Sequence, residues 1–124
     1  MLLIDTHILL WALYDSGKLT ERARIALNHD DRCVSIASLW EMAIKQSLGK
    51  LELSQSIEEI AEQCDKNDIS IIGIEPKHCQ KQMELPFIHK DPFDRIIIAQ
   101  AVTEGYTIIT ADEYIQQYDV KTLW

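Results

Sequence analysis

Short apolar runs alternate along this chain with longer segments that carry helix signals, and this alternation is the strongest constraint on its fold. Four of the runs have the length and apolarity of buried strands: Met1 to Ile4, Cys33 to Ile36, Ile69 to Ile74 and Tyr106 to Thr110. Val120 to Leu123 is a candidate fifth strand at an edge. Such alternation favours a parallel sheet with right-handed crossovers and helices on both faces. We therefore predict an α/β fold with a mainly parallel sheet of four or five strands.

The segments between these runs begin with residues that favour helix starts. These residues are Thr20, Ser38, Ser56, Pro76, and Asp91 followed by Pro92. His7 to Tyr14 is apolar enough for a buried helix, and Asp112 to Gln117 is a candidate short helix. Ser38 and Glu41 have the spacing of a capping box, for a helix that Gly49 is placed to end. Gly105 is placed to end the helix that follows Asp91.

The size and composition indicate one globular domain over residues 1–124. A chain of 124 residues is near the usual size of a single domain, and no repeat, linker or low-complexity segment divides it. Hydrophobic residues make up 47% and charged residues 26%, which is typical of a folded protein and not of a disordered one.

The formal charge of −8, from 20 acidic residues against 12 lysines and arginines, argues against a broad basic surface for nucleic acid. Any contact with DNA or RNA is therefore expected to be local. A cluster of acids that holds divalent cations would account for part of this negative charge.

The three cysteines do not predict a disulfide framework or a zinc site. Cys33, Cys64 and Cys79 are odd in number and widely spaced. The amino terminus has no basic segment or cleavage site, and no apolar run is long enough to span a bilayer. We expect a cytoplasmic protein without membrane contact.

Four acids from distant parts of the sequence are expected at the same edge of the predicted sheet. Asp5 directly follows the first strand, and Asp112 follows the strand that ends at Thr110. Glu41 and Asp94 are expected in the first turns of helices. In a parallel α/β sheet the carboxyl ends of strands and the amino ends of the following helices share one edge. Their side-by-side placement also requires a suitable strand order, which the sequence does not give.

Four carboxylates at one place repel each other and therefore predict a bound cation or partial protonation. Oxygen ligands suit Mg²⁺ or Mn²⁺. Each acid also has a purely structural interpretation. Glu41 fits the capping box with Ser38, and Asp5 and Asp112 fit helix caps. Asp94 fits a first-turn acid, although it heads the apolar stripe of its helix, where an unpartnered acid is costly.

Four stretches together resemble the PIN domain family, in particular its VapC-type toxins. They are LLIDTHILLWAL, SIASLWEMAIK, HKDPFDRIIIAQA and TIITAD, and the resemblance runs from Met1 almost to Trp124. It implies a three-layer α/β/α sandwich. It also implies that Asp5, Glu41 and Asp94 are the principal metal-binding acids, that Asp112 is a more variable fourth acid, and that Thr110 is a supporting hydroxyl beside them.

The resemblance further implies a function and partners. The expected activity is a Mg²⁺- or Mn²⁺-dependent endoribonuclease, the toxin of a type II toxin–antitoxin pair, which hydrolyses RNA with a metal-activated water. The expected partners are RNA, a cognate antitoxin and a second copy of the chain. His7 and Arg95 fit the pattern of this subgroup, and with Lys45 they are our candidates for substrate contact.

Two other function classes remain open from the sequence. One is a phosphoacceptor receiver domain, which also uses Mg²⁺ and acids at strand ends, but Asp5-Thr-His supplies only one of the adjacent acids that it needs. The other is a non-catalytic protein-interaction module in which the acids serve as caps.

Overall fold

The computed structural model describes residues 1–124 and contains a sheet of five parallel strands in the order β3-β2-β1-β4-β5. The central strand β1 (Leu2–Ile4) pairs with β2 (Arg32–Ser35) on one side and β4 (Thr107–Ile109) on the other. The edge strands are β3 (Ile69–Ile72) and β5 (Thr122–Leu123). The predicted α/β class and parallel sheet are confirmed.

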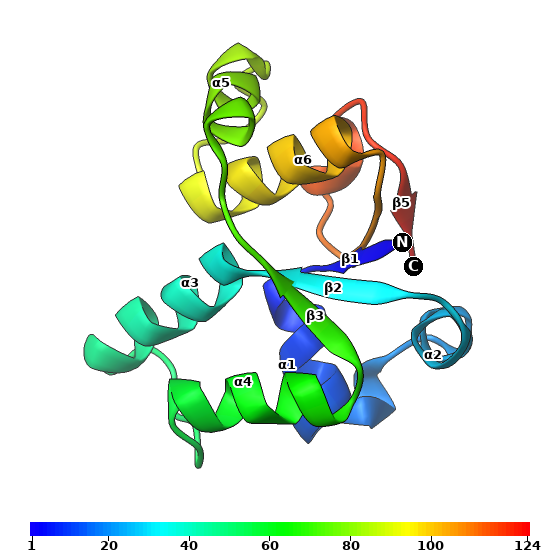
Figure 1. Cartoon of the computed structure of the whole chain (residues 1–124), viewed down its shortest axis with the longest axis vertical. Coiled ribbons are helices and arrows are strands. Elements are labelled where there is room, and N and C mark those ends of the chain that lie inside the picture. The colour runs from blue at the N-terminus through cyan, green and yellow to red at the C-terminus, as the bar shows by residue number, and fades with distance from the viewer.

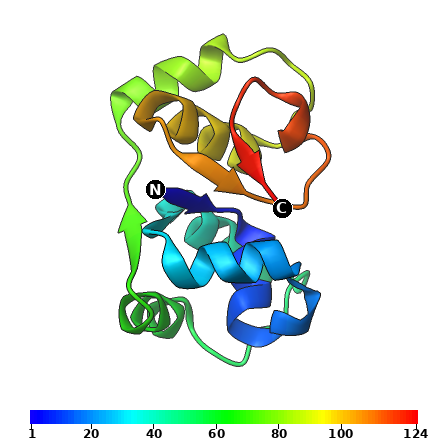
Figure 2. The same cartoon turned by 90° about the vertical axis from the view of Figure 1, so that its right-hand side faces the viewer.

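Alternating strand residues build two separate hydrophobic cores, one on each face of the sheet. Ile4, Val34 and Ile109 contribute to the core under α1 (Thr6–Tyr14), α2 (Glu21–His29), α3 (Ile36–Ser47) and α4 (Ile57–Lys66). Their neighbours Leu3, Cys33 and Ile108 contribute to the core under α6 (Pro92–Glu104). The helix α5 (Pro76–Glu84) packs mainly against α6. Figures 1 and 2 show helices on both sides of the sheet, which confirms the three layers.

Most of the predicted helix boundaries are confirmed by cap geometry. The Thr20 side chain accepts a hydrogen bond from the Ala23 amide, and Ser56 forms a full capping box with Glu59. Pro76 and Pro92 both lie in first turns, and the side chain of Asp91 caps α6. Gly105 ends α6 in the left-handed conformation, with φ of 75°.

The predicted capping box of Ser38 and Glu41 is wrong. The helix α3 begins at Ile36, because Ser35 at the end of β2 is its N-cap and accepts a hydrogen bond from the Ala37 amide. Ser38 is therefore already inside the helix, and Glu41 lies in the second turn and not the first. The short sequence SIAS offers two serines, and the end of the strand selects the earlier one.

Several other boundaries differ from those predicted, and β4 and β5 are both shorter than expected. The strand β2 ends at Ser35 and β3 ends at Ile72, both earlier than expected. The segment from Asp112 to Gln117 is a turn followed by a single 3-10 turn, η2 (Ile115–Gln117). A second 3-10 turn, η1 (Ser16–Lys18), links α1 to α2. No helix combines the length and the apolarity that crossing a membrane requires.

Candidate active site

The strand order brings Asp5 and Thr110 together although they are 105 residues apart in the sequence. Their strands, β1 and β4, are neighbours at the centre of the sheet, where the connections change direction. Ligands of open α/β sheets usually bind at this point. The Thr110 hydroxyl donates to Asp5 Oδ2 over 2.8 Å, and the Asp5 amide donates to Ile109 O over 3.1 Å. Thr110 thus holds one oxygen of the Asp5 carboxylate.

Asp5 does not serve as a simple helix cap. It precedes α1, but its side chain makes no capping hydrogen bond, and only 3% of the residue is exposed. Burial raises the pKa of Asp5, and the charges of Asp112 and Glu41 raise it further. A buried carboxylate that neither caps a helix nor forms an ion pair is an unusual structural element and a reasonable ligand for a cation.

Asp112 closes a turn and also lies beside Asp5. Its Oδ1 accepts hydrogen bonds from the amides of Tyr114 and Ile115, at 2.8 and 3.1 Å. Its own amide donates to the Thr110 hydroxyl over 3.0 Å. The predicted helix cap is not formed, because the N-cap of η2 is Tyr114; the Asp112 side chain instead closes the preceding turn, and Thr110 links it to Asp5.

Glu41 is buried and only half satisfied. Its Oε2 accepts from Lys45 Nζ over 2.7 Å, whereas its Oε1 is buried with no hydrogen-bond partner. An unpartnered buried carboxylate oxygen costs free energy, so it points to a missing ligand. One turn earlier, the Thr6 hydroxyl donates to the Ser38 hydroxyl over 2.8 Å. This bond joins α1 to α3 and aligns the segments that carry Asp5 and Glu41.

Asp94 is the third residue of α6 and lies at the head of its buried stripe of Ile97 and Ile98. Its Oδ2 is 3.0 Å from His89 Nε2. Burial raises the pKa of Asp94 to about 7, and the nearby charges of Asp91, Asp5 and Asp112 act in the same direction. Asp94 therefore heads the apolar stripe, as the sequence predicted, with 16% of its side chain exposed and His89 as its partner.

The four predicted acids border one region but do not form a closed ligand shell. Asp5 is within electrostatic reach of Glu41 and Asp112, and Asp94 is within reach of Asp5 and Asp112. The hydrogen bond to Glu41 and the charges of Glu41 and Asp94 raise the pKa of Lys45. No three of these carboxylates bring ligand atoms within 4.8 Å of one another. The side chains of Lys45 and His89 hold Glu41 and Asp94 in their present positions.

A tighter acidic group lies elsewhere, where Glu75, His78 and Glu104 bring ligand atoms within 4.8 Å of one another. His78 Nδ1 accepts from the Glu75 amide, so Nε2 carries the ring proton and donates to Glu104. Both ring nitrogens are therefore occupied, and neither offers a free lone pair to a metal. This group is a helix cap that ties α5 to α6.

The three candidates for substrate contact occupy different environments. His7 is exposed and lines two hollows, one with Asp5 and Asp112 and the other with Glu41 and Lys45. Lys45 is partly exposed and is paired with Glu41. Arg95 is buried, with 2% exposure, and donates to four acceptors within the protein. Proposals for substrate contact therefore rest on His7 and Lys45.

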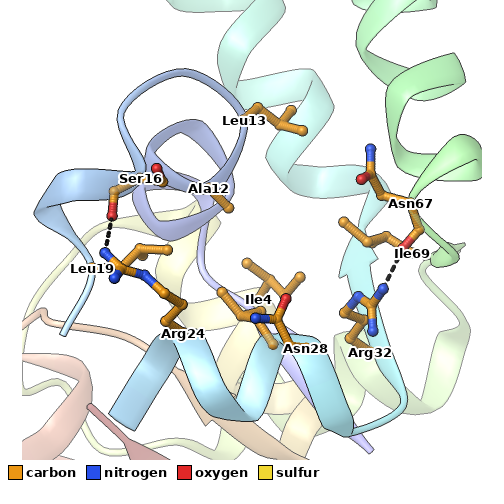
Figure 3. Close-up of a pocket in the computed structure, with 11 residues that line it drawn as sticks. Ile4, Ala12, Leu13, Ser16, Leu19, Arg24, Asn28, Arg32, Asn67 and Ile69 are labelled. Atoms are coloured by element: carbon orange, nitrogen blue, oxygen red, sulfur yellow. Dashed lines mark hydrogen bonds between the residues drawn. The ribbon is translucent and has the colours of Figure 1, made fainter. Parts of the chain in front are cut away.

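Another hollow, of about 300 Å³, lies away from the acids among α1, α2 and the adjoining ends of β2 and β3. Figure 3 shows its lining, which combines apolar side chains such as Ile4 and Ile69 with two arginines. Arg24 donates to Ser16 O, and Arg32 donates to Asn67 O. Both arginines are therefore engaged with backbone carbonyls. None of the four acids lines this hollow, so it contributes nothing to the acidic site.

The donor set at the acidic edge fits a hard divalent cation. The side chains are oxygen donors, Glu41 Oε1 has no partner, and burial together with the neighbouring carboxylates raises the pKa of Asp5 and Asp94. A divalent ion would satisfy the orphaned oxygen and cancel the repulsion.

Sequence reasoning missed four side chains that organise this edge. They are Thr6, Ser38, His89 and Tyr118. The segment HKDPFD does contain His89 five residues before Asp94, but a loop histidine carries no periodic signal. Only the folded loop shows which atoms it contacts.

Comparison with known proteins now identifies the family, because the PIN domain model matches residues 2–121. This chain belongs to the PIN domain family. Ribonuclease VapC22 of Mycobacterium tuberculosis is a relative of this PIN domain, 25% identical over 118 residues that cover 94% of this chain and 90% of the relative. The resemblance stated from the sequence is thereby confirmed.

Solved structures share the fold of this PIN domain at low sequence identity. VapBC2 from Rickettsia felis, bound to a fragment of promoter DNA, aligns with a TM-score of 0.70 and 16% identity over 98% of this chain and 96% of that chain. FitAcB from Neisseria gonorrhoeae aligns with a TM-score of 0.69 and 17% identity over 100% and 97%. A toxin–antitoxin complex from Klebsiella pneumoniae aligns with 0.64 and 19% over the same shares.

Family membership and strand order together exclude the receiver-domain hypothesis. Receiver domains have the strand order 2-1-3-4-5, whereas the PIN domain described here has β1 at the centre, between β2 and β4. This order places the ends of β1 and β4 side by side, with Asp5 and Thr110 in contact.

Proposed function

We propose that this PIN domain is a divalent-metal-dependent endoribonuclease that acts as the toxin of a toxin–antitoxin pair. The observation that carries the proposal is the buried, unpartnered Glu41 Oε1, at an edge where Asp5, Asp94 and Asp112 raise the local negative charge. The relative VapC22 is a ribonuclease, which supports the choice of RNA as the substrate.

Asp5, Glu41 and Asp94 are the residues that would hold Mg²⁺ or Mn²⁺, and Asp112 would assist them. When bound, such an ion polarises a water and neutralises charge on the phosphodiester. Thr110 orients the Asp5 carboxylate, and Lys45 orients Glu41. In the hydrolysis, the water oxygen bonds to phosphorus, the bond from phosphorus to the 3′ oxygen breaks, and the leaving oxygen takes a proton. The products carry a 5′-phosphate and a 3′-hydroxyl.

We propose single-stranded or looped RNA as the substrate class. A net charge of −8 argues against the broad basic surface that binding a duplex would need, whereas splayed single strands are recognised by local contacts. His7 and Lys45, beside the acids, are the side chains placed for such contacts.

An antitoxin and a second copy of the chain are the proposed protein partners. Support comes from the VapBC and toxin–antitoxin complexes that share this fold. The native mass of the purified chain, alone and with a co-expressed antitoxin, tests both. A monomeric mass for the free chain would contradict the homodimer.

The decisive experiment compares wild type with Asp5→Asn and Asp94→Asn. We expect each variant to remain folded and to lose RNA cleavage by about two orders of magnitude or more, since each removes a proposed ligand charge. EDTA is expected to abolish wild-type cleavage, and Mg²⁺ or Mn²⁺ to restore it. Glu113→Gln is the matched control, because it removes an exposed acid next to Asp112 without touching the site.

The same experiment separates catalysis from a non-catalytic interaction module. Cleavage that resists EDTA and survives both substitutions would reject the assigned chemistry. Antitoxin binding with no cleavage under any metal would favour the module.

A further inference from the structure

We propose that His89 is a positioning residue that aims the Asp94 carboxylate, and that a hydrogen-bond chain from Arg95 through Tyr118 fixes the ring nitrogen that carries its proton. The inference rests on the proposed function, because Asp94 is there a metal ligand. Neither the family resemblance nor the sequence assigned a role at the site to His89 or Tyr118. Arg95, a sequence candidate for substrate contact, enters the inference as a buried support.

The chain begins at the buried Arg95, whose guanidinium is a permanent donor. Its Nη2 donates to Gln82 O and Leu85 O at the end of α5, at 3.1 and 3.2 Å. Its Nη1 donates to Pro86 O over 2.7 Å and to Tyr118 Oη over 3.1 Å. Arg95 therefore fixes the start of the loop that carries His89 and occupies the tyrosine oxygen from one side.

Tyr118 then has only one proton to give, and the geometry determines where it goes. Its Oη also accepts from the His89 amide, at 3.3 Å. The nearest remaining partner is His89 Nδ1, at 2.8 Å, whereas the His89 carbonyl is 3.5 Å away. The phenol therefore donates to Nδ1, which must be the unprotonated nitrogen.

The ring proton consequently lies on Nε2, which is 3.0 Å from Asp94 Oδ2. The ionised carboxylate is only an acceptor, so with Asp94 ionised both ends of the imidazole require the same tautomer. Asp94 Oδ2 is thereby held, and Oδ1, which has no protein partner, is left for a ligand. Hydrogen bonds of this kind to ligating groups strengthen metal binding by orienting the ligand atoms.

Packing restricts the His89 ring as well. Tyr114 stacks on it with ring centroids 5.2 Å apart and planes 10° apart, and the Tyr118 ring meets it edge to face at 5.5 Å. The Asp112 side chain caps the turn that carries Tyr114. The turn of Asp112 thus helps to place the histidine that orients Asp94.

The first test is the tautomer of His89 in the metal-free wild-type protein, read from long-range ¹H–¹⁵N correlations of ¹⁵N-histidine-labelled protein. At pH 8, where the Asp94 carboxylate is ionised, we expect a single tautomer with the proton on Nε2, and a mixture of tautomers in Tyr118→Phe. The signal is assigned by its loss in a His89 variant. A proton on Nδ1 in wild type, or an unchanged spectrum in Tyr118→Phe, would overturn the inference.

The second test measures Mn²⁺ affinity in two matched variants. The amide nitrogen of His89→Gln reaches the position of Nε2, whereas that of His89→Asn reaches only the position of Nδ1. We expect the Gln variant to retain affinity within a few-fold of wild type and the Asn variant to lose about tenfold. Equal affinities in the two variants would contradict a positioning role.

The two tests distinguish the inference from the function on which it rests. If wild type binds no Mn²⁺, the proposed nuclease chemistry fails, while the tautomer measurement still decides whether the chain through Tyr118 exists. If wild type binds Mn²⁺ and both His89 variants match it, only the inference fails.

Discussion

Asp94 lies at the start of α6 with its carboxylate mostly buried, and burial raises its pKa to about 7, well above the ordinary value of 3.8. The folded protein therefore binds the proton of the Asp94 carboxyl group more tightly than the unfolded chain does. The contribution of this protonation to folding stability is fully present below the ordinary pKa and is lost as the pH rises through about 7. In our proposal, the metal ligand Asp94 is thus a source of instability in metal-free protein at neutral pH.

Asp94→Asn is expected to raise the melting temperature of the metal-free protein at pH 8 by several degrees, and to change it little at pH 5. The amide removes the buried charge but still accepts the hydrogen bond from His89. Thermal unfolding in EDTA at the two pH values measures the effect. Mg²⁺ should raise the melting temperature of wild type at pH 8 and leave the variant unchanged, and an equal response of both would count against Asp94 as a ligand.

Lys45→Met is expected to lower the stability of metal-free protein by about 1–2 kcal/mol. It leaves the buried Glu41 carboxylate without its cation, and the usual cost of that loss is reduced here because 40% of the Lys45 side chain is exposed. Urea unfolding in EDTA measures the change.

The control is the double variant Glu41→Gln with Lys45→Met, in which no charge is left unpaired. We expect it to recover much of the loss, as a double-mutant cycle would show for directly coupled residues. Additive effects would mean that the ion pair contributes nothing.

At the scale of elements, two helices and two strand ends build the site. The helices α3 and α6 lie on opposite faces of the sheet and begin at the same edge, where they present Glu41 and Asp94. The start of α6 is fixed by the Asp91 cap, and its end by Gly105. The position of the helix along its axis, and so of Asp94, depends on both ends.

Gly105→Ala is expected to destabilise the protein by about 1 kcal/mol, because residue 105 has a φ of 75°, which alanine adopts at a cost. Gly73→Ala is the matched control. An added Cβ meets nothing within 4 Å at either position, and only Gly105 has a positive φ. Chemical denaturation of the two variants isolates the backbone effect, and equal losses would show that conformation is not the cause.

The whole molecule carries a charge of −8, which repels RNA at long range. Attraction is therefore confined to the few cations near the site and, in our proposal, to the bound metal. The molecule lacks the excess of basic residues that makes most nucleic-acid binding fall steeply with salt.

We therefore expect kcat/KM for RNA cleavage to depend only weakly on monovalent salt at constant Mg²⁺. Between 25 and 200 mM KCl, the slope of log kcat/KM against log salt should be smaller in magnitude than about 2, since few phosphate contacts release counterions. Cleavage rates with a labelled single-stranded RNA measure this slope. A value near −5 or steeper would reveal a cationic surface that the proposal does not contain.

The sequence by itself determined the class of fold and most helix boundaries, and it singled out the four acids that our proposal uses. These features depend on interactions between residues close in the sequence. The spacing of apolar residues distinguishes strands from helices. Hydrogen bonds to nearby backbone groups mark the helix ends at Thr20, Ser56, Asp91 and Gly105. Where two local solutions competed, as for Ser35 and Ser38, the pattern favoured the wrong one, because the end of β2 and not the spacing decided the helix start.

Only the tertiary structure decided which acids meet and what holds them. The order with β1 between β2 and β4 places Thr110 against Asp5, and the packed loop after α5 places His89 against Asp94. It also revealed Arg95 as a buried support for that loop. Strand order and loop packing arise from contacts between distant residues, and such contacts leave no periodic trace in a single sequence.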